Sequence, residues 1–479
     1  MGRILLRNRK WLLLPVEVKA REFASRLFLA GIAAEEGYGV IFGYQSRFMK
    51  YFINDHLKNK LPKGIYLDKS IASNKIDILQ KIRNLGHIIA SLDEEGFAFR
   101  KENLYFLNAR LSTETIGLTS HIYAWGTEMS EAILNRFPVA ADKLMVTGNP
   151  RFDLLRPEFL PFYANAVQRI LQKYYDYILI PSNFAAAINA SGDQFLLKQA
   201  EVYGHIRTKQ DRDYLLELID YTKNNYKKFK EAILTLSDLF QGINFIIRPH
   251  PADNHHCWEK LADIKKNIKI VYEGSITPWL LGAKAVVHHG CTTGVEAYLL
   301  GVPSISYLPY ENNFFDSSIS NRINLKIYKF SILKDCINKI VTDGHFSFYS
   351  GDTLSRSSSK RFIASLDGKY SAEKIVEALL KIDIPDDDLI WDDKKKFKAI
   401  IRKHLPPEVV KIYHKLMWRN NIKADKNTLK FSENHVKQKY PGSDLNEVKE
   451  IMNKFSNITG RFNSLKIKNL DDDLFLIYK

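Results

Sequence analysis

Cysteine is scarce in this chain. Three residues, Cys257, Cys291 and Cys336, stand among 479. A small, odd number of cysteines excludes a disulfide framework and fits a reducing compartment, so we expect a cytoplasmic protein. No metal-ligand spacing joins the three cysteines, and we therefore expect no structural metal site.

Long apolar runs are also missing. The N-terminal region combines a basic start with an apolar stretch that is shorter than the core of a secretion signal. No stretch approaches the roughly 18 apolar residues of a membrane-spanning helix. We interpret Trp11 to Val16 as a first buried strand. The expected protein is soluble, or at most peripheral on the inner face of the cytoplasmic membrane.

Acidic side chains are outnumbered. The chain has 70 lysines and arginines against 54 aspartates and glutamates, which gives a formal net charge of +16. Such an excess favours an anionic partner, and three classes qualify: nucleic acid, an anionic membrane surface and a phosphorylated substrate. The sequence has no zinc-finger spacing, no aromatic RNA-binding motif and no convincing recognition helix. Nucleic acid is therefore not an expected partner.

The chain does contain a regular alternation of short apolar strands and helices. Hydrophobic residues make up 45% of the sequence, which is enough for ordinary cores. Strand-like runs separated by helical stretches are typical of βαβ units and parallel sheets. The alternation occurs twice, which predicts an α/β protein with two Rossmann-like domains facing a central cleft. The predicted units are 1–157, 158–384 and a basic helical appendage, 385–479, where the alternation stops.

The strongest motif is VVHHGCTTGVEAYLLGVPSISY, residues 286–307. It predicts a buried strand, a tight turn around Cys291, an apolar helix from Val295 and another strand. The hydroxyls of Thr292 and Thr293, with free amides at the helix start, can bind an anion such as a phosphate. Cys291, Thr292 and Thr293 are therefore expected to belong to the donor-binding site. Glu296, one turn into the helix, can accept hydrogen bonds from ribose hydroxyls. The alternative is that the threonines only cap the helix and Glu296 supports it.

A second motif, FIIRPHPADN, occupies residues 245–254. Two prolines fix the backbone so that Arg248 and His250 project from the carboxyl end of a strand. An arginine can bind phosphate with two parallel hydrogen bonds, and a histidine can donate to the same oxygens. The alternative interpretation makes Arg248 a surface ion-pair partner and His250 an ordinary loop residue.

Two further segments supply candidates for the cleft. LDEEG, residues 92–96, sets Asp93 and Glu94 at a strand end, where neighbouring carboxylates raise one another's pKa as a base or nucleophile requires. The alternative is a solvated acidic loop. VTGNPRFD, residues 146–153, predicts a tight turn with Asn149 lining the cleft and with a local ion pair between its arginine and its aspartate. Asn183, after another apolar strand, is also expected to line the cleft.

VTGNPRFD, RPHPAD, Trp279 and the 288–307 segment together resemble the bacterial surface carbohydrate biosynthesis proteins over about residues 10 to 380. GIYLDKS and LDEEG match that pattern as well. VTGNPRFD and TTGVEA are similar, more distantly, to segments of UDP-N-acetylglucosamine 2-epimerases and CDP-glycerol glycerophosphotransferases. The resemblance implies a GT-B fold, with donor phosphate contacts at His250, Thr292 and Thr293 and a ribose contact at Glu296. One departure is that Cys291, Thr292 and Thr293 stand where the epimerase pattern has Ser-Gly.

The resemblance and the motifs together predict a metal-independent glycosyltransferase that uses a nucleotide-activated sugar in the synthesis of a bacterial capsule or lipopolysaccharide. The second domain is expected to bind the nucleotide sugar, and the first to present a glycan or lipid-linked acceptor. No cofactor is expected beside the donor substrate. A nucleotide-sugar 2-epimerase, a glycerophosphotransferase and a non-catalytic binding subunit of a polysaccharide assembly complex are the alternatives.

The appendage contains KKKFKAIIRKHL, residues 394–405. Its lysines and arginine alternate with apolar side chains, as in helices that lie on membrane surfaces. We expect this segment to bind anionic membranes. The alternative is a helix packed on the first domain with its lysines in water.

Overall fold

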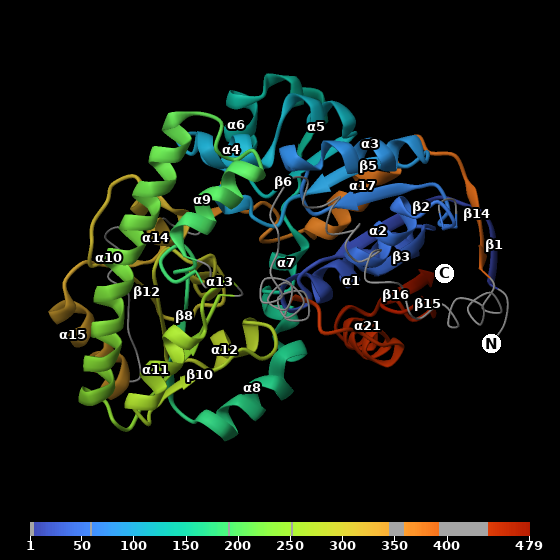
Figure 1. Ribbon diagram of the computed structural model, residues 1–479. Helices are drawn as coiled ribbons and strands as arrows, with labels where there is room; N and C mark the ends of the chain where they lie inside the picture. Colours follow the sequence, from blue (N-terminus) through green and yellow to red (C-terminus); the bar gives the residue numbers. More distant parts are fainter. Residues whose placement is uncertain (1–3, 58–59, 190–191, 251, 344–358, 392–438) are drawn as a thin grey trace.

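The computed structural model describes residues 4–57, 60–189, 192–250, 252–343, 359–391 and 439–479. Two sheets, each covered by helices, stand on either side of the short helix α7 (Pro150–Asp153) (Figure 1). A two-stranded antiparallel sheet of β1 (Ile4–Arg9) and β14 (Asp387–Trp391) flanks the first of them. The predicted α/β architecture with two Rossmann-like units is confirmed.

The first sheet has eight strands in the order β15-β16-β3-β2-β4-β5-β6-β7. Its six N-terminal strands are parallel, and β15 and β16 run antiparallel at one edge. All six residues of β2 are buried, as expected of a strand covered on both faces. The predicted strand Trp11–Val16 is this strand. The strands are β2 (Trp11–Val16), β3 (Gly39–Tyr44), β4 (Ile65–Asp68), β5 (Ile88–Leu92), β6 (His121–Ala124), β7 (Leu144–Val146), β15 (Lys466–Asp471) and β16 (Leu474–Tyr478).

Helices on both faces of this sheet bury its apolar side chains in one core. The longest, α1 (Lys19–Glu35), is buried from Phe23 to Ala34 apart from one residue, because it packs on β2, β3 and the C-terminal helices. The others are α2 (Gln45–Ile53), α3 (Ile76–Asn84), α4 (Leu104–Arg110), α5 (Thr113–Leu118) and α6 (Thr127–Arg136), with 3-10 turns η1 (Ser73–Lys75), η2 (Gly96–Ala98), η3 (Pro138–Lys143) and η4 (Pro157–Phe159).

The second sheet has six parallel strands in the order β10-β9-β8-β11-β12-β13. The strands are β8 (Tyr177–Pro181), β9 (Asn244–Arg248), β10 (Ile268–Ile270), β11 (Ala285–His288), β12 (Ser304–Tyr307) and β13 (Leu325–Ile327). The helices are α8 (Leu160–Tyr174), α9 (Asp193–Val202), α10 (Lys209–Leu239), α11 (His256–Ile264), α12 (Thr277–Gly282), α13 (Thr293–Leu299), α14 (Ile319–Ile323) and α15 (Phe330–Asp343), with the 3-10 turn η5 (Phe315–Ser317).

The C-terminal residues return to the first sheet. Helix α17 (Ser371–Leu380) falls within the predicted second unit, 158–384, but it packs on α1 and α7 of the first domain. The predicted helical appendage needs correction in its described part, because beside α21 (Leu445–Thr459) it contributes the strands β14, β15 and β16. The charged surroundings of the short apolar run LFLIY concealed a strand that is buried throughout. Residues 394–405 lie outside the described residues.

Candidate functional site

Each sheet contains a point where the chain order reverses. In the second sheet the chain runs from β8 to β9 and β10, then returns to β11 on the other side of β8. In the first sheet it runs from β2 to β3 and then returns to β4. The loops at the carboxyl ends of such strand pairs diverge and leave a crevice in which ligands bind. A substrate site is therefore expected at these two switch points.

The turn after β11 forms one side of the second switch point. Gly290 adopts a left-handed conformation with φ of 61° and lets the chain turn from the strand into α13. Gly294 packs so closely on β11 that a Cβ there would lie 2.2 Å from Nε2 of His288. The backbone N–H of Thr293 interacts with the Cys291 thiol, and among the described residues no backbone acceptor receives the N–H of Thr292. The Thr292 amide and the hydroxyls of Thr292 and Thr293 are therefore the donors that this turn offers to a ligand.

Cys291 contributes less directly to this turn. Its Sγ donates to Oγ1 of Thr293 over 3.3 Å, and its carbonyl accepts from Oγ of Ser320 over 2.5 Å. Burial raises the pKa of the Cys291 thiol, so the sulfur stays protonated near neutral pH. Its contacts shape the turn and give no sign of nucleophilic chemistry.

Glu296 lies in the first turn of α13 and is 2% exposed. Its Oε1 is 2.7 Å from Nε of Arg151, which reaches over from α7. Its Oε2 is buried and has no partner among the described residues. An unsatisfied buried carboxylate oxygen is unusual and marks a place where a ligand hydroxyl can donate. The predicted local pair of Arg151 with Asp153 is wrong, because Arg151 is committed to Glu296.

Arg248 is occupied by its own domain. Its two terminal nitrogens donate to the carbonyls of Glu273 and Gly274 over 2.8 and 2.9 Å, and its guanidinium stacks 5.1 Å from the Trp279 ring. Burial lowers the pKa of Arg248 to about 10. Arg248 therefore holds the loop between β10 and α12. Its predicted contact with the donor phosphate needs correction, because the two loop carbonyls already occupy its terminal nitrogens.

His250 remains available to a ligand. The backbone N–H of Ala252 donates to its Nδ1 over 3.1 Å, so the neutral ring carries its proton on Nε2. Asp253 fixes the loop by accepting from the backbone N–H of His250 over 3.1 Å. Although the side chain is reached by solvent, desolvation by surrounding atoms lowers the pKa of His250, while Asp253 and Glu95 oppose that shift. His250 is therefore a neutral Nε2–H donor at pH 7.

Glu95 follows β5 of the first sheet, and its charge acts on the pKa of His250 in the second domain. Arg21 and Lys439, also from the first domain, act on the pKa of His250 as well. These charges belong to the first domain, and Lys439 lies at its switch point. There, Glu17 follows β2 and Lys69 follows β4, and the two form an ion pair.

Lys439 completes this cluster, with its Nζ 2.8 Å from Oε1 of Glu17. Burial would raise the pKa of Glu17, but Lys69 and Lys439 hold it well below its usual range. Sequence reasoning missed all three residues. Glu17 and Lys69 each follow an apolar strand directly, and this position could have revealed them, whereas no local signal points to Lys439.

The LDEEG carboxylates differ from the prediction. Asp93 is 5% exposed and forms a two-pronged ion pair with Arg110, with contacts of 2.6 and 3.1 Å. Glu94 is 3% exposed and accepts from Nε and NH2 of Arg26. Burial raises the pKa of Glu94, and its Oε2 has no partner among the described residues. Neither carboxylate reaches the cleft, because Arg26 of α1 and Arg110 of α4 bind them inside the first domain.

Glu95 is the carboxylate that stays in the cleft, with 41% of its side chain exposed. Its Oε1 is 2.6 Å from NH1 of Arg21. Burial alone would raise the pKa of Glu95, but Arg21 and Arg110 lower it to about 2. The carboxylate is therefore ionised at every physiological pH.

The two predicted cleft-lining asparagines have different positions. Asn183 is exposed at the end of β8, and its Nδ2 donates to the His289 carbonyl over 3.2 Å, which bridges the second switch point. Asn149 is 1% exposed and accepts from the backbone N–H of Arg151 over 2.9 Å. It caps α7 and does not line the cleft, because the side chain turns back onto its own helix.

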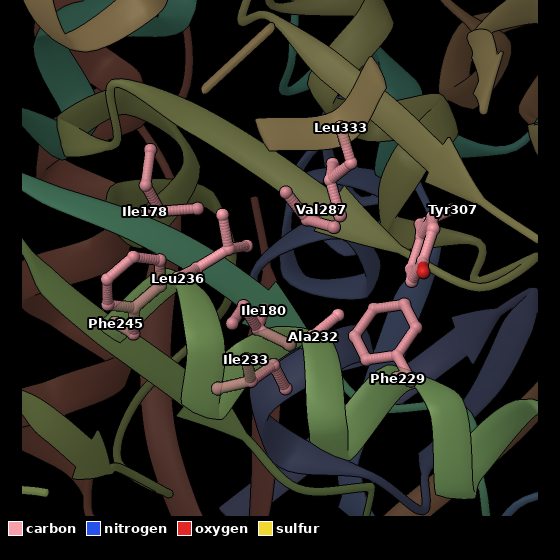
Figure 2. Close-up of a pocket in the computed structure, with 10 residues that line it drawn as sticks. All are labelled: Ile178, Ile180, Phe229, Ala232, Ile233, Leu236, Phe245, Val287, Tyr307 and Leu333. Carbon is pink, nitrogen blue, oxygen red and sulfur yellow. The ribbon is translucent and has the colours of Figure 1, made fainter. Parts of the chain in front are cut away.

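The core of the second domain contains a small cavity, drawn in Figure 2. Its volume is about 10 Å³, which is room for one water molecule at most. The cavity cannot hold a nucleotide, and we interpret it as imperfect packing. It is lined by Ile178, Ile180, Phe229, Ala232, Ile233, Leu236, Phe245, Val287, Tyr307 and Leu333.

The part of the chain that the structure describes contains neither a metal site nor a membrane-spanning helix. Over the described ranges, no group of three or more His, Cys, Asp and Glu side chains is arranged to hold a metal ion. Within the same ranges, no helix is both long and apolar enough to cross a membrane.

No sequence-family model matches the chain, and no curated protein matches it. Among solved structures, the UDP-GlcNAc 2-epimerase of Methanocaldococcus jannaschii, in complex with UDP-GlcNAc and UDP, is similar over 77% of this chain and 99% of its own, with a TM-score of 0.50 and 15% sequence identity. The fold is of the GT-B type. The enzyme of Neisseria meningitidis bound to UDP-GlcNAc matches over 78% of this chain and 100% of its own, with a TM-score of 0.47 and 13% identity. The distant similarity indicated by VTGNPRFD and TTGVEA is thus confirmed as a similarity of GT-B fold.

Proposed function

We propose that this chain is a glycosyltransferase that uses a nucleotide-activated sugar in the synthesis of a bacterial capsule or lipopolysaccharide. The observation that carries the proposal is the second switch point, where the free amide of Thr292 and the hydroxyls of both threonines lie one turn from the unsatisfied Oε2 of Glu296. Phosphate needs donors and ribose needs an acceptor, and the site offers both. The GT-B fold, which this chain shares with an epimerase that binds UDP-GlcNAc, supports the same conclusion.

The donor side of the reaction follows from these groups. The Thr292 amide and the hydroxyls of Thr292 and Thr293 bind the diphosphate, and the Nε2–H of His250 adds another donor. Helix α13 has seven residues, so we assign the effect to the individual donors and not to a helix dipole. Donors that are fixed before the reaction stabilise the charge that develops on the departing phosphate, and the proposed transfer uses them without a cofactor.

The acceptor side lies at the first switch point. A hydroxyl of the glycan or lipid-linked acceptor donates to the Glu95 carboxylate and attacks the anomeric carbon. The new carbon–oxygen bond forms as the bond to phosphate breaks, the hydroxyl proton passes to Glu95 and then to solvent, and the nucleoside diphosphate leaves. Because the pKa of Glu95 is about 2, Glu95 orients the hydroxyl well but is a weak base.

A nucleotide-sugar 2-epimerase is the second candidate. It is favoured by the fold of the Methanocaldococcus jannaschii enzyme and by the charge of Glu95 acting on His250 from the other domain, because two titratable groups at one sugar suit proton removal and return. Product analysis after incubation with a nucleotide sugar and bacterial glycan separates the candidates. Transfer supports the proposal, and release of an epimerised sugar supports the second candidate. A phosphodiester product or binding without turnover contradicts both.

The site makes a first prediction about affinity. His250→Ala, and separately Thr292→Val with Thr293→Val, should each weaken nucleotide-sugar binding by roughly tenfold to a hundredfold, because each removes hydrogen bonds to a charged phosphate worth about 1.5 to 3 kcal/mol. Calorimetric titration measures this. His256→Ala is the matched control, since His256 starts α11 and makes a side-chain contact with Glu259. Unchanged affinity in both site variants would remove the donor site from the second domain.

A further inference from the structure

Arg100 is a buried arginine of the first domain that touches the second. It follows η2, beyond the carboxyl end of β5, and is 8% exposed. Its NH1 donates to Oγ of Ser317, and its guanidinium lies 5.7 Å from the centroid of the Phe314 ring. Both of these partners belong to the second domain. Arg100 therefore spans the junction between the two domains.

What distinguishes Arg100 is the lack of a carboxylate partner. Among the described residues, no acidic side chain forms an ion pair with it, and no acceptor receives its Nε or NH2. The nearby Glu128 binds NH2 of Arg322 with both oxygens, at 2.8 and 3.0 Å. Burial lowers the pKa of Arg100, although Tyr214, Glu102 and Glu128 oppose that shift. Nε and NH2 of Arg100 are not among the buried side-chain nitrogens that lack a partner, so they remain open to a ligand.

Other buried arginines in this protein show what full compensation requires. Arg26, 1% exposed, donates to Glu94 and to three strand-end carbonyls. Arg156, 7% exposed, donates to three carbonyls of the segment 365–369 and lies 3.8 Å from Asp153. Arg100, by comparison, donates to a single acceptor, the hydroxyl of Ser317. The partner that is missing from its surroundings is an anion.

The position of Ser317 indicates which anion. The next residues of the chain lie against the turn after β11, since Oγ of Ser320 donates to the Cys291 carbonyl. Oγ of Ser318 would be 3.5 Å from a Cβ placed on Gly290. In the same segment, Oδ1 of Asn321 is buried without a partner among the described residues. Arg100 is thus linked through Ser317 to the segment that packs on the turn proposed to bind the diphosphate.

We infer that Arg100 binds the diphosphate of the nucleotide ligand from the first domain, so that the two domains close on the ligand through this side chain. The inference rests on the proposed function in taking that ligand to be a nucleotide sugar. A guanidinium can grip two phosphate oxygens in parallel, and a cation brought by the opposite domain makes tight binding depend on closure.

A simpler role is that Arg100 only holds the domains together. Arg322 is the matched control for that role, because it also crosses the junction, to Glu128, and stacks 4.6 Å from the Phe362 ring, but its charge is already paired. Replacing Arg322 removes a domain contact and leaves the charge at Arg100. The two arginines therefore separate a ligand contact from a domain contact.

The experiment measures binding calorimetrically for the wild type, Arg100→Gln, Arg100→Lys and Arg322→Gln. The ligands are inorganic pyrophosphate, whichever of ADP, CDP, GDP and UDP binds best, and its parent nucleoside. We expect Arg100→Gln to lose tenfold or more in affinity for the nucleoside diphosphate and for pyrophosphate, with little change for the nucleoside. Arg100→Lys should keep part of the affinity because it keeps the charge, and Arg322→Gln should change all affinities by less than threefold.

Equal losses for nucleoside and diphosphate, or equal losses in Arg100→Gln and Arg322→Gln, would overturn the inference. So would wild-type affinity in Arg100→Gln. Failure of the wild type to bind any nucleoside diphosphate would contradict the proposed function, and the inference would then stand only if pyrophosphate binds and requires Arg100. If Arg100→Gln does not fold, Arg100→Lys and Ser317→Ala provide the comparison. Binding of neither ligand by the wild type overturns both ideas.

Discussion

Three consecutive carboxylates follow β5, and each meets a different environment. Asp93 is bound by Arg110, Glu94 is bound by Arg26, and Glu95 lies in the cleft beside Arg21. The chemistry of each carboxylate is decided by the arginine that reaches it. The three side chains therefore allow a test in which neighbours of the same type serve as controls for one another.

Glu95→Gln should lower turnover strongly while changing donor affinity and the unfolding temperature little. The acceptor hydroxyl would lose the anion that orients it, whereas the partly exposed side chain contributes little to the fold. Asp93→Asn should instead lower the free energy of unfolding by roughly 3 to 5 kcal/mol, because it leaves the Arg110 charge buried without its partner. Steady-state kinetics and thermal unfolding measure the two effects. Normal turnover in Glu95→Gln would show that LDEEG takes no part in the reaction.

The sequence indicated that an acidic run ends a buried strand, and β5 confirms that placement. It could not show which carboxylate faces the cleft. That choice depends on Arg21 and Arg26 in α1 and on Arg110 in α4, whose distances to the acids are set by tertiary packing. Arg248 shows the same difficulty, because the carbonyls that occupy it come from a loop with no recognisable pattern.

A buried carboxylate, Asp153, holds the start of helix α17 against α7 of the first domain. The two oxygens of Asp153 accept from the backbone N–H groups of Ser371 and Ala372 over 2.8 and 2.9 Å, at the start of the helix. Arg156 binds the carbonyls just before it and lies 4.4 Å from the Tyr370 ring centroid. The turn and short helix of VTGNPRFD thus hold a segment that is distant in sequence.

Asp153 should make the stability of this attachment depend on pH. Burial raises its pKa to about 6 despite the two amide hydrogen bonds, so the folded state prefers the protonated acid. A raised folded pKa adds stability that is complete below the unfolded pKa of about 3.9 and is lost as the pH rises through 6. The loss amounts to about 3 kcal/mol for a shift of this size.

Denaturant unfolding at pH 4 and pH 7 checks this prediction. The wild type should have a larger stability advantage over Asp153→Asn at pH 4 than at pH 7. Asp142→Asn is a control for general effects of charge, because Asp142 is an exposed residue of η3. A constant difference between the wild type and Asp153→Asn would show that Asp153 does not titrate in this range.

Strands and helices with a clear local pattern could be predicted from the sequence. Trp11–Val16 forms the expected strand β2. Helix α10 begins with a capping box of Thr208 and Asp211, which is a signal that the local sequence carries. The strands β15 and β16 could not be predicted in the same way. They are stable because they extend a sheet whose nearest strand, β3, lies far away in sequence.

The C-terminal region also changes how the membrane prediction must be tested. A chain that ends at Ile384 would lose β14, β16 and Lys439 together, and β16 is buried throughout against β3. Such a truncation would damage the first domain and remove a cleft residue. It would therefore confuse loss of membrane binding with loss of folding.

Substitution within 394–405 avoids that difficulty. We expect the full-length protein to sediment with anionic vesicles at low salt, and a glutamine variant to stay in solution, because each basic residue near the surface contributes about 1 kcal/mol. Zwitterionic vesicles are the control, and the unfolding temperature should be unchanged. Equal sedimentation of both proteins would leave this segment without a membrane role. The replaced residues are Lys394, Lys395, Lys396, Lys398, Arg402 and Lys403.

The pairing of Gly43 with Leu474 sets the order in which the molecule can be completed during synthesis. All strands of the second sheet lie between Tyr177 and Ile327, so that domain has left the ribosome long before β16 emerges. Until then the edge of β3 has no strand to pair with, and an open edge invites pairing with other chains. A nascent chain stalled before β16 would carry a finished second domain beside an unfinished first one. A chain that lacks β16 is therefore expected to aggregate more readily than one that contains it.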